Sequence, residues 1–195
     1  MSLEVISGCM FSGKTEELVR RLRRAVISDA LVIAFKPAVD ARYHDSDIAS
    51  HHGGTFGAVA VDSVEGMKAR LPPTLVPGTV IGFDEAQFMN EEIIDLLDDL
   101  AGKDCRVIVA GLDLDYRGVP FGPMPQLLAM ADDVTKLSAV CVGDTQAGRC
   151  GKRATRSYRV PSRDTGAQVQ VGGQDVYEAR CRLHWHPEPT PSMYS

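Results

Sequence analysis

Residues 8–15 read Gly-Cys-Met-Phe-Ser-Gly-Lys-Thr, which satisfies the Gly-x4-Gly-Lys-Thr pattern of a phosphate-binding loop. The run Leu3-Glu4-Val5-Ile6 before it is typical of a buried strand. The segment 14–27 after it places Leu18, Leu22 and Val26 four residues apart among several arginines, which predicts an amphipathic helix. Strand, loop and helix therefore come in the order that phosphate binding needs.

The loop predicts a site for the phosphates of a nucleotide. Gly8 and Gly13 allow its N–H groups to face inward, and the N-terminus of the following helix adds favourable partial charge. Lys14 would reach the β- and γ-phosphates, and Thr15 would offer its hydroxyl to magnesium. The alternative is a glycine-rich turn with a solvated lysine. Cys9 is either a thiol whose pKa the helix N-terminus lowers or a small buried filler.

Four further apolar runs indicate the rest of a sheet, and they lie at 31–35, 59–61, 79–83 and 106–110. A helical pattern extends from Asn90, its expected cap, to Leu100. Alternation of strands and helices predicts an α/β fold with a mainly parallel sheet, which we expect to occupy residues 1–140.

A pair of acidic residues follows the run at 79–83. The strand delivers Asp84 and Glu85 to the edge where ligands bind in open α/β sheets. Asp84 is a natural magnesium partner, and Glu85 is free to act as a general base toward water or a substrate hydroxyl. The sequence therefore predicts an ATPase or a kinase. The alternative is that both carboxylates only cap the helix that follows.

Composition narrows the partners and the compartment. The 195-residue chain has a net charge of −5 and a pI near 5.5, so we expect no nucleic-acid partner. No segment approaches membrane-spanning length and the first residues lack a secretory pattern, so we expect no membrane partner. Five cysteines, three of them in the last third, suit a reducing compartment and a metal site. A cytoplasmic location is therefore expected.

Blocks of residues along nearly the whole chain resemble the type II thymidine kinases, which have a RecA-like α/β core and a zinc-containing lobe. The matching blocks lie at 10–15, 36–37, 40–43, 50–53, 84–88, 111–118, 120–122 and 171–173, with Tyr177. Their order and spacing together make the resemblance specific. Cys9 and Tyr116 depart from it, because they stand where proline and phenylalanine are common.

The resemblance implies transfer of the γ-phosphate of ATP to the 5′-hydroxyl of thymidine. Glu85 would be the catalytic base, with Lys14 and Arg42 at the developing charge. Magnesium would be held by Thr15, Asp40 and Asp84. ATP would be bound by Gly8, Cys9, Met10, Phe11, Ser12, Gly13, Lys14, Thr15, Asp84, Glu85, Ala86 and Gln87.

The resemblance also implies a pocket that encloses thymidine. Its side chains would be Met10, Phe88, Leu112, Tyr116, Phe121 and Tyr177, and a lasso would add Val169, Gln170, Val171, Gly172 and Gly173. Aromatic and backbone groups of this kind suit a flat base. From the residues alone, the core is the more common place for the apolar members.

The last third predicts a small, loop-dominated lobe at 141–186 with a metal site. Cys141, Cys150, Cys181 and His184 form a usual tetrahedral zinc set, and four protein ligands would make the zinc structural. The first two cysteines are separated by eight residues where the family usually has two. This indicates an inserted loop at 142–149, and Asp144 or His186 could replace Cys141 as a ligand. The alternative is reduced thiols without metal.

Two other functions stay open on the residues alone. One is a P-loop ATPase whose lobe binds a protein or nucleic acid, and the other is a nucleotide-binding regulator without turnover. The resemblance further implies a homotetramer and feedback inhibition by thymidine triphosphate (dTTP). We expect residues 187–195 to form a disordered tail.

Overall fold

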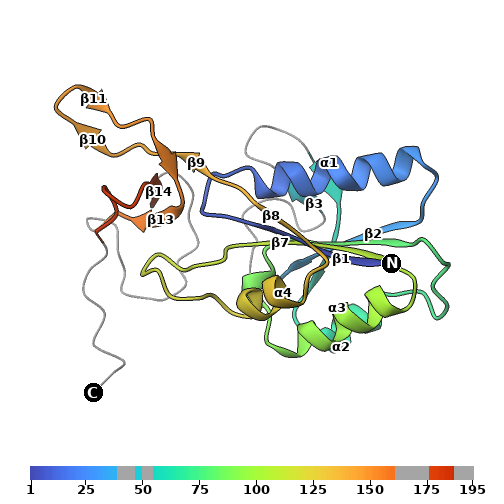
Figure 1. Cartoon of the computed structure of the whole chain (residues 1–195). Coiled ribbons are helices and arrows are strands. Elements are labelled where there is room, and N and C mark those ends of the chain that lie inside the picture. The colour runs from blue at the N-terminus through green and yellow to red at the C-terminus, as the bar shows by residue number, and fades with distance from the viewer. Residues whose placement is uncertain (39–46, 50–54, 161–175, 187–195) are drawn as a thin grey trace, which may run out of the picture.

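The computed structural model describes residues 1–38, 47–49, 55–160 and 176–186. Its centre is a six-stranded parallel sheet in the order β5-β2-β6-β7-β1-β8 (Figure 1). These strands are β1 Ser2–Ser7, β2 Val32–Pro37, β5 Val59–Val61, β6 Val80–Phe83, β7 Arg106–Gly111 and β8 Asp133–Lys136. A short antiparallel ladder joins β3 Asp47–Ala49 to β4 Thr55–Gly57. The predicted α/β fold with a mainly parallel sheet is confirmed.

Helices cover both faces of this sheet (Figure 1). Helix α1 (Lys14–Ile27) lies on one face, and α2 (Val64–Lys68), α3 (Glu92–Gly102) and α4 (Met124–Met130) lie on the other. Successive strand residues point to opposite faces, so β7 packs Val107 and Val109 on the α3 side and Ile108 and Ala110 on the α1 side. Burial on both faces explains why the central strands read as continuous apolar runs.

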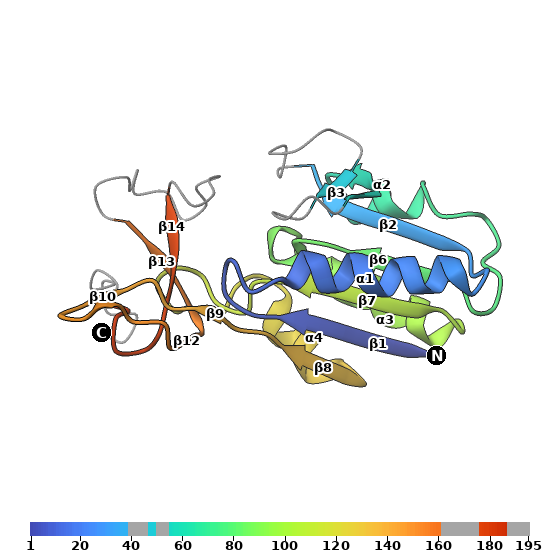
Figure 2. The same ribbon diagram turned by 90° about the horizontal axis from the view of Figure 1, so that it is seen from above.

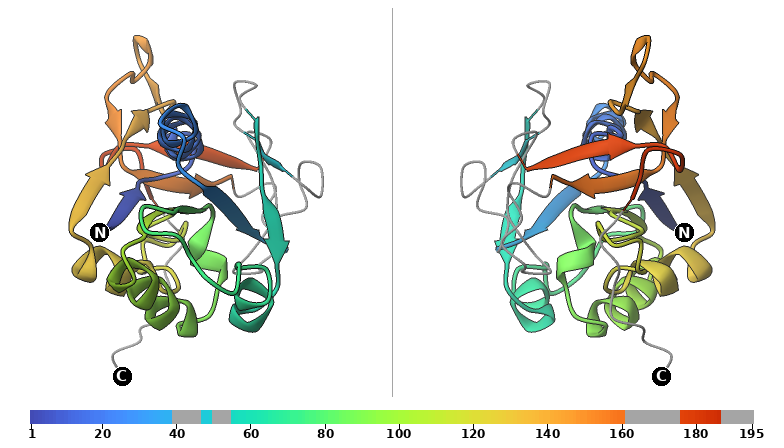
Figure 3. Two further views of the ribbon diagram at one scale, coloured as in Figure 1. Left: turned by 90° about the vertical axis from the view of Figure 1, so that its right-hand side faces the viewer. Right: turned by 90° about the vertical axis from the view of Figure 1, so that its left-hand side faces the viewer.

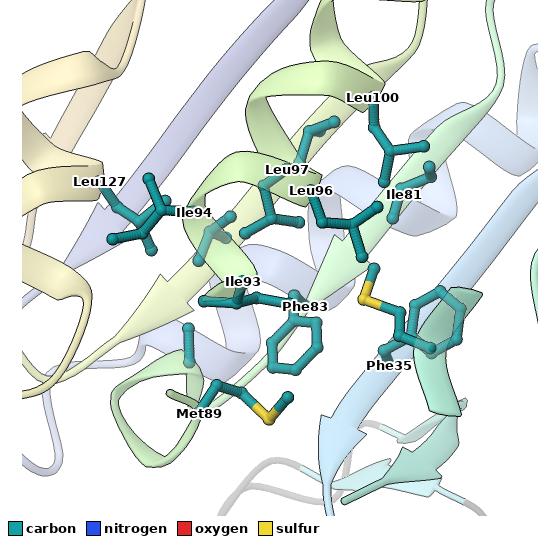
Figure 4. Packing of buried hydrophobic residues seen from close by; sticks show 14 of the residues in the cluster. Phe35, Ile81, Phe83, Met89, Ile93, Ile94, Leu96, Leu97, Leu100 and Leu127 are labelled. Carbon is teal, nitrogen blue, oxygen red and sulfur yellow. The ribbon is translucent and has the colours of Figure 1, made fainter. Parts of the chain in front are cut away.

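The core on the α3 side is closely packed (Figure 4). Ile93 and Leu97 of α3 point toward the sheet, where they meet Phe83 of β6. The rings of Phe35 and Phe83 stack with centroids 6.5 Å apart. This packing makes β6 a rigid base for the residues that follow it.

A charged cluster ties four elements together beside the α1 face. Glu4 of β1 accepts hydrogen bonds from Arg21 of α1 (2.7 Å) and Arg106 of β7 (2.6 Å). Arg21 also donates to Thr135 of β8 at 2.8 Å. Burial opposes ionisation of Glu4, but the two arginines outweigh it and hold the pKa of Glu4 below its ordinary value.

Several details of the helices and strands differ from expectation, and the short elements α2, β3 and β4 were not predicted. Asn90 is not a helix cap, because α3 begins at Glu92 and the Asn90 amide donates to the Glu92 carboxylate (3.1 Å) instead of accepting from the backbone. Helix α4 and edge strand β8 were not predicted. Strand β8 reads Asp-Val-Thr-Lys and is mostly exposed, so it carries no apolar run.

Six short strands beyond β8, which we call the distal ladders, form three antiparallel pairs. They are β9 (Ala139–Val140) with β12 (Arg153–Ala154), β10 (Asp144–Thr145) with β11 (Gly148–Arg149), and β13 (Arg156–Arg159) with β14 (Tyr177–Arg180). The prediction of a loop-dominated lobe missed them, because strands of two to four residues are too short to show alternation. They lie beyond the carboxyl ends of the sheet (Figure 2), with β13 and β14 across that end (Figure 3).

Candidate active site

The phosphate loop joins β1 to α1, as the sequence predicts. Gly13 caps α1 in the left-handed region at φ 83°, which turns the chain into the helix. Lys14 is buried, and its ammonium donates to the carbonyl of Cys9 across the loop at 3.0 Å. The lysine therefore lies over the mouth of the loop, where the phosphates of a nucleotide would stand.

The acidic pair of β6 lies next to this loop. The Thr15 hydroxyl donates to Asp84 Oδ2 at 3.0 Å, while the backbone N–H of Glu85 donates to Asp84 Oδ1 at 3.0 Å. Burial, with the nearby charge of Glu85 as a second cause, raises the pKa of Asp84 to about 7. A buried carboxylate beside a hydroxyl is a fitting donor pair for magnesium, whose charge would compensate the desolvation.

The carboxylate of Glu85 is held by the side chain of Gln87. Glu85 has a positive φ of 53° and begins the short 3-10 helix η1 (Ala86–Phe88). The side-chain amide of the buried Gln87 donates to the Glu85 carboxylate and accepts from the backbone N–H of Leu112 at 2.9 Å. Gln87 therefore fixes the carboxylate of Glu85 relative to the segment that follows β7.

That segment carries predicted pocket residues. The rings of Phe88 and Phe121 meet edge to face with centroids 5.7 Å apart. Met10, Phe88, Leu112, Tyr116 and Phe121 all keep partial exposure, and none belongs to a buried core cluster of the described residues. Partial exposure leaves these five side chains open to a ligand, whereas Tyr177, the sixth predicted member, is buried. The pocket interpretation therefore stays a prediction.

An arginine that sequence reasoning missed lies between the two tyrosines of the predicted pocket. Arg159 of β13 is buried, and its guanidinium carbon lies 3.7 Å from the ring centroid of Tyr116 and 5.3 Å from that of Tyr177. It also donates to the Tyr177 hydroxyl at 2.7 Å. No sequence motif predicts this residue, because its contacts depend on the fold and Tyr116 lies 43 positions before it in the chain.

The distal ladders touch the phosphate loop directly. The backbone N–H of Met10 donates to the hydroxyl of Ser157 at 3.1 Å, and the Cys9 thiol donates to the carbonyl of Ala154 at 3.4 Å. Burial raises the pKa of the Cys9 thiol. A lowered pKa for Cys9 is therefore wrong, and the interpretation as a small buried filler holds.

The structure brings the four predicted zinc ligands together. The ligand atoms of Cys141, Cys150, Cys181 and His184 all lie within 4.8 Å of one another. His184 Nδ1 is 3.5 Å from the sulfur of Cys141 and 3.4 Å from that of Cys181. Zinc bonds of about 2.0 to 2.3 Å in a tetrahedron place ligand atoms about 3.5 to 3.8 Å apart, so the residues fit a zinc ion.

The inserted residues after Cys141 form the β10–β11 hairpin. Below it, the N–H of Cys150 donates to the Gly143 carbonyl (2.8 Å) and the N–H of Gly151 donates to the Cys141 carbonyl (3.0 Å). These bonds return Cys150 to Cys141 despite the insertion. Asp144 lies in the exposed hairpin and His186 is exposed after the cluster, and neither joins the metal-ligand group found among the described residues.

Other predicted site residues lie outside the part of the chain that the structure describes. These are Asp40 and Arg42, and the lasso residues Val169, Gln170, Val171, Gly172 and Gly173. Within the described part, none of the helices has the length and apolar character needed to cross a bilayer.

Comparisons with known proteins agree with this geometry. Residues 1–185 match the model of the thymidine kinase family. A thymidine kinase of Coprothermobacter proteolyticus is 50% identical over 98% of this chain and 93% of its own length. One of Deinococcus deserti is 51% identical over 93% of each chain, and one of Bdellovibrio bacteriovorus is 45% identical over 95% of this chain and 86% of its own. A solved ATPase aligns over 92% of this chain and 79% of its own length, with a TM-score of 0.42 and 12% identity.

Proposed function

This chain belongs to the thymidine kinase family, and on that premise we propose that it transfers the γ-phosphate of ATP to the 5′-hydroxyl of thymidine. The observation that carries the proposal is the family match over residues 1–185, a span that includes every predicted site residue. The hydrogen bond from Thr15 to Asp84 supports the proposal, because it brings the phosphate loop and the acidic pair together.

We assign the phosphate side of the reaction to four residues. Lys14 neutralises charge on the β- and γ-phosphates, and Thr15 with Asp84 holds magnesium, which when bound supplies further positive charge to these oxygens. Glu85 takes the proton of the attacking hydroxyl, with its carboxylate aimed by Gln87. The contribution of Arg42 and Asp40, at the developing charge and at magnesium, is proposed from the family resemblance.

We assign the nucleoside side to the aromatic segment after β7 and to the distal ladders. Tyr116, Phe121 and Phe88 supply ring contacts for the base, with Met10, Leu112 and Tyr177 beside them. The lasso residues 169–173 would read the base edge through backbone groups. Zinc at the Cys3His cluster would hold the lobe together rather than take part in the reaction, because four protein ligands occupy its coordination sites.

The proposal extends to the surroundings of the enzyme. A division into a core at 1–140 and a lobe at 141–186, a homotetramer, and feedback inhibition by dTTP are proposed from the resemblance. A cytoplasmic location is proposed because none of the five cysteines forms a disulfide, as expected in a reducing compartment.

The test is a radiolabelled ATP assay against a panel of nucleosides with magnesium present. Label should appear in thymidine monophosphate, more weakly in deoxyuridine monophosphate, and ATP loss should equal nucleotide formed. ATP hydrolysis that proceeds equally with and without thymidine, and yields no nucleotide, would instead indicate a P-loop ATPase. ATP binding without any turnover would indicate a regulator.

A further inference from the structure

Trp185 lies immediately after the metal ligand His184 and contacts two segments that border the site. It is the one tryptophan of the chain. Its indole N–H donates to the Ser157 carbonyl of β13 at 3.1 Å, and the Arg156 guanidinium lies 5.6 Å from the ring centroid. A Cβ placed on Gly118 would come within 2.6 Å of the ring, so the indole lies directly against the backbone of Gly118.

Gly118 belongs to a tight turn that carries Tyr116. The carboxylate of the buried Asp115 accepts from the N–H groups of Arg117 (2.8 Å) and Val119 (2.9 Å), and the Gly118 N–H donates to the Asp115 carbonyl (3.1 Å). Gly118 has a φ of +81°, a conformation that other residues rarely adopt. We expect a turn bonded in this way to move as a unit. A displacement of Gly118 would therefore also displace the side chain of Tyr116.

Trp185 is also linked to the phosphate loop through Ser157. Ser157, whose carbonyl accepts from Trp185, accepts the N–H of Met10 with its hydroxyl. The N–H of His184 donates to the Cys181 carbonyl at 3.0 Å, which closes a turn over residues 181–184. We call this the metal turn, and Trp185 follows it directly. The indole therefore lies where the metal turn, the Tyr116 turn and the contact to Met10 meet.

We propose that Trp185 is a positioning residue for the nucleoside side of the reaction: it holds the Tyr116 turn at the distance that the metal-bound turn dictates. The expected change in the KM for thymidine rests on the proposed function. The fixed position of the metal turn rests on zinc at the Cys3His cluster. The proposal assigns the zinc site a purpose beyond holding the lobe together, namely fixing the position of the Tyr116 turn.

The first experiment compares two glycines of nearly equal φ. Gly118→Ala introduces a Cβ into the indole, whereas Gly78→Ala at φ +84° meets only the end of the Met1 side chain at 4.0 Å. Gly118→Ala should raise the KM for thymidine about tenfold, equivalent to about 1.4 kcal/mol, while the KM for ATP stays within about twofold. Gly78→Ala should carry the same backbone strain but leave both KM values unchanged.

A double variant separates the indole contact from backbone strain. In a Trp185→Leu background the clash is removed, so Gly118→Ala should add at most about twofold to the KM for thymidine. An equal effect in both backgrounds would overturn the proposal. Trp185→Phe is a milder variant that keeps an aromatic ring. The urea unfolding midpoints of the single and double variants give a second measure of the coupling between Gly118 and Trp185.

The second experiment uses the emission of the single tryptophan and needs no turnover. EDTA treatment, with metal loss confirmed by elemental analysis, should shift the emission to longer wavelength, and zinc should restore it. Emission that is indifferent to metal loss would overturn the proposal, as would isolated protein without metal. If the wild type makes no thymidine monophosphate, the proposed function fails, while the emission and unfolding couplings still decide whether Trp185 links the metal turn to Gly118.

Discussion

The two sides of the site are held in place by different means. The phosphate side stands on the ends of β1 and β6, and each strand lies within a sheet buried by helices on both faces. The nucleoside side is assembled from the Tyr116 turn, β13, β14 and the metal turn, which contact one another through single side chains such as Arg159 and Trp185. The first side draws its rigidity from a hydrophobic core, and we expect the second to draw its rigidity from the proposed metal site and a few polar and ring contacts.

The largest expected effect concerns chemistry on the phosphate side alone. Glu85→Gln removes the proposed base but keeps a side chain of the same shape, so kcat should fall about a thousandfold while ATP affinity changes little. Initial rates and ATP titration measure the two quantities. Glu65→Gln, an exposed carboxylate on α2, is the control and should leave kcat unchanged. Unaltered turnover in Glu85→Gln would remove Glu85 as the base.

Loss of the metal should affect the nucleoside side of the site and leave the phosphate side folded. His184→Ala should release zinc and raise the KM for thymidine about a hundredfold, because metal binding free energy is folding free energy for such a cluster. Hydrogen exchange should quicken in β9, β12 and β14 while β1 and β7 stay protected. His186→Ala, exposed and outside the cluster, is the matched control. Loss of protection throughout the sheet would show that the two sides are not independent.

The same contrast explains what the sequence predicts well. The phosphate loop, Asp84 and Glu85 are predicted because their contacts follow from short stretches of chain on buried strands, where pattern and structure coincide. Arg159, Ser157 and Trp185 are not, because each acts on a partner far away in the sequence. The predicted zinc ligands lie between these cases. Their residue types are diagnostic, but only the backbone bond from Cys150 to Gly143 explains how the widened spacing still closes the cluster.

A smaller effect should appear in the stability of the core. Glu4→Gln removes the carboxylate that accepts from both Arg21 and Arg106, although Arg21 keeps its bond to Glu17. The change should lower the free energy of unfolding by about 2 kcal/mol at pH 7. Urea denaturation followed by circular dichroism measures it. Asp99→Asn, which breaks an exposed pair with Lys103, is the control and should cost less than about 0.5 kcal/mol.

The pH dependence of that stability has a definite sign. The pKa of Glu4 in the folded protein lies below its ordinary value of 4.5. Hydrogen bonds from Arg20 and Arg21 lower the pKa of Glu17 to about 2 despite partial burial. Their contribution is therefore present above pH 4.5 and is lost as the pH falls through the folded values. Glu4→Gln should flatten the acid limb of the stability profile. An identical acid limb in the variant and the wild type would assign it to other carboxylates.

The smallest effect is expected from removal of the inserted β10–β11 hairpin on the nucleoside side. Replacing 144–149 by two glycines removes the exposed β10–β11 hairpin but keeps Gly143 and Cys150, whose backbone bond closes the cluster. Shortening a solvent-exposed loop changes closure entropy by only about 0.5 kcal/mol, so zinc content and the KM for thymidine should both stay within about twofold of wild type. Elemental analysis and initial rates measure them. Loss of zinc in this variant would mean that the hairpin, rather than the two backbone bonds beneath it, brings Cys150 to Cys141, and the metal side of the site would then depend on the insertion itself.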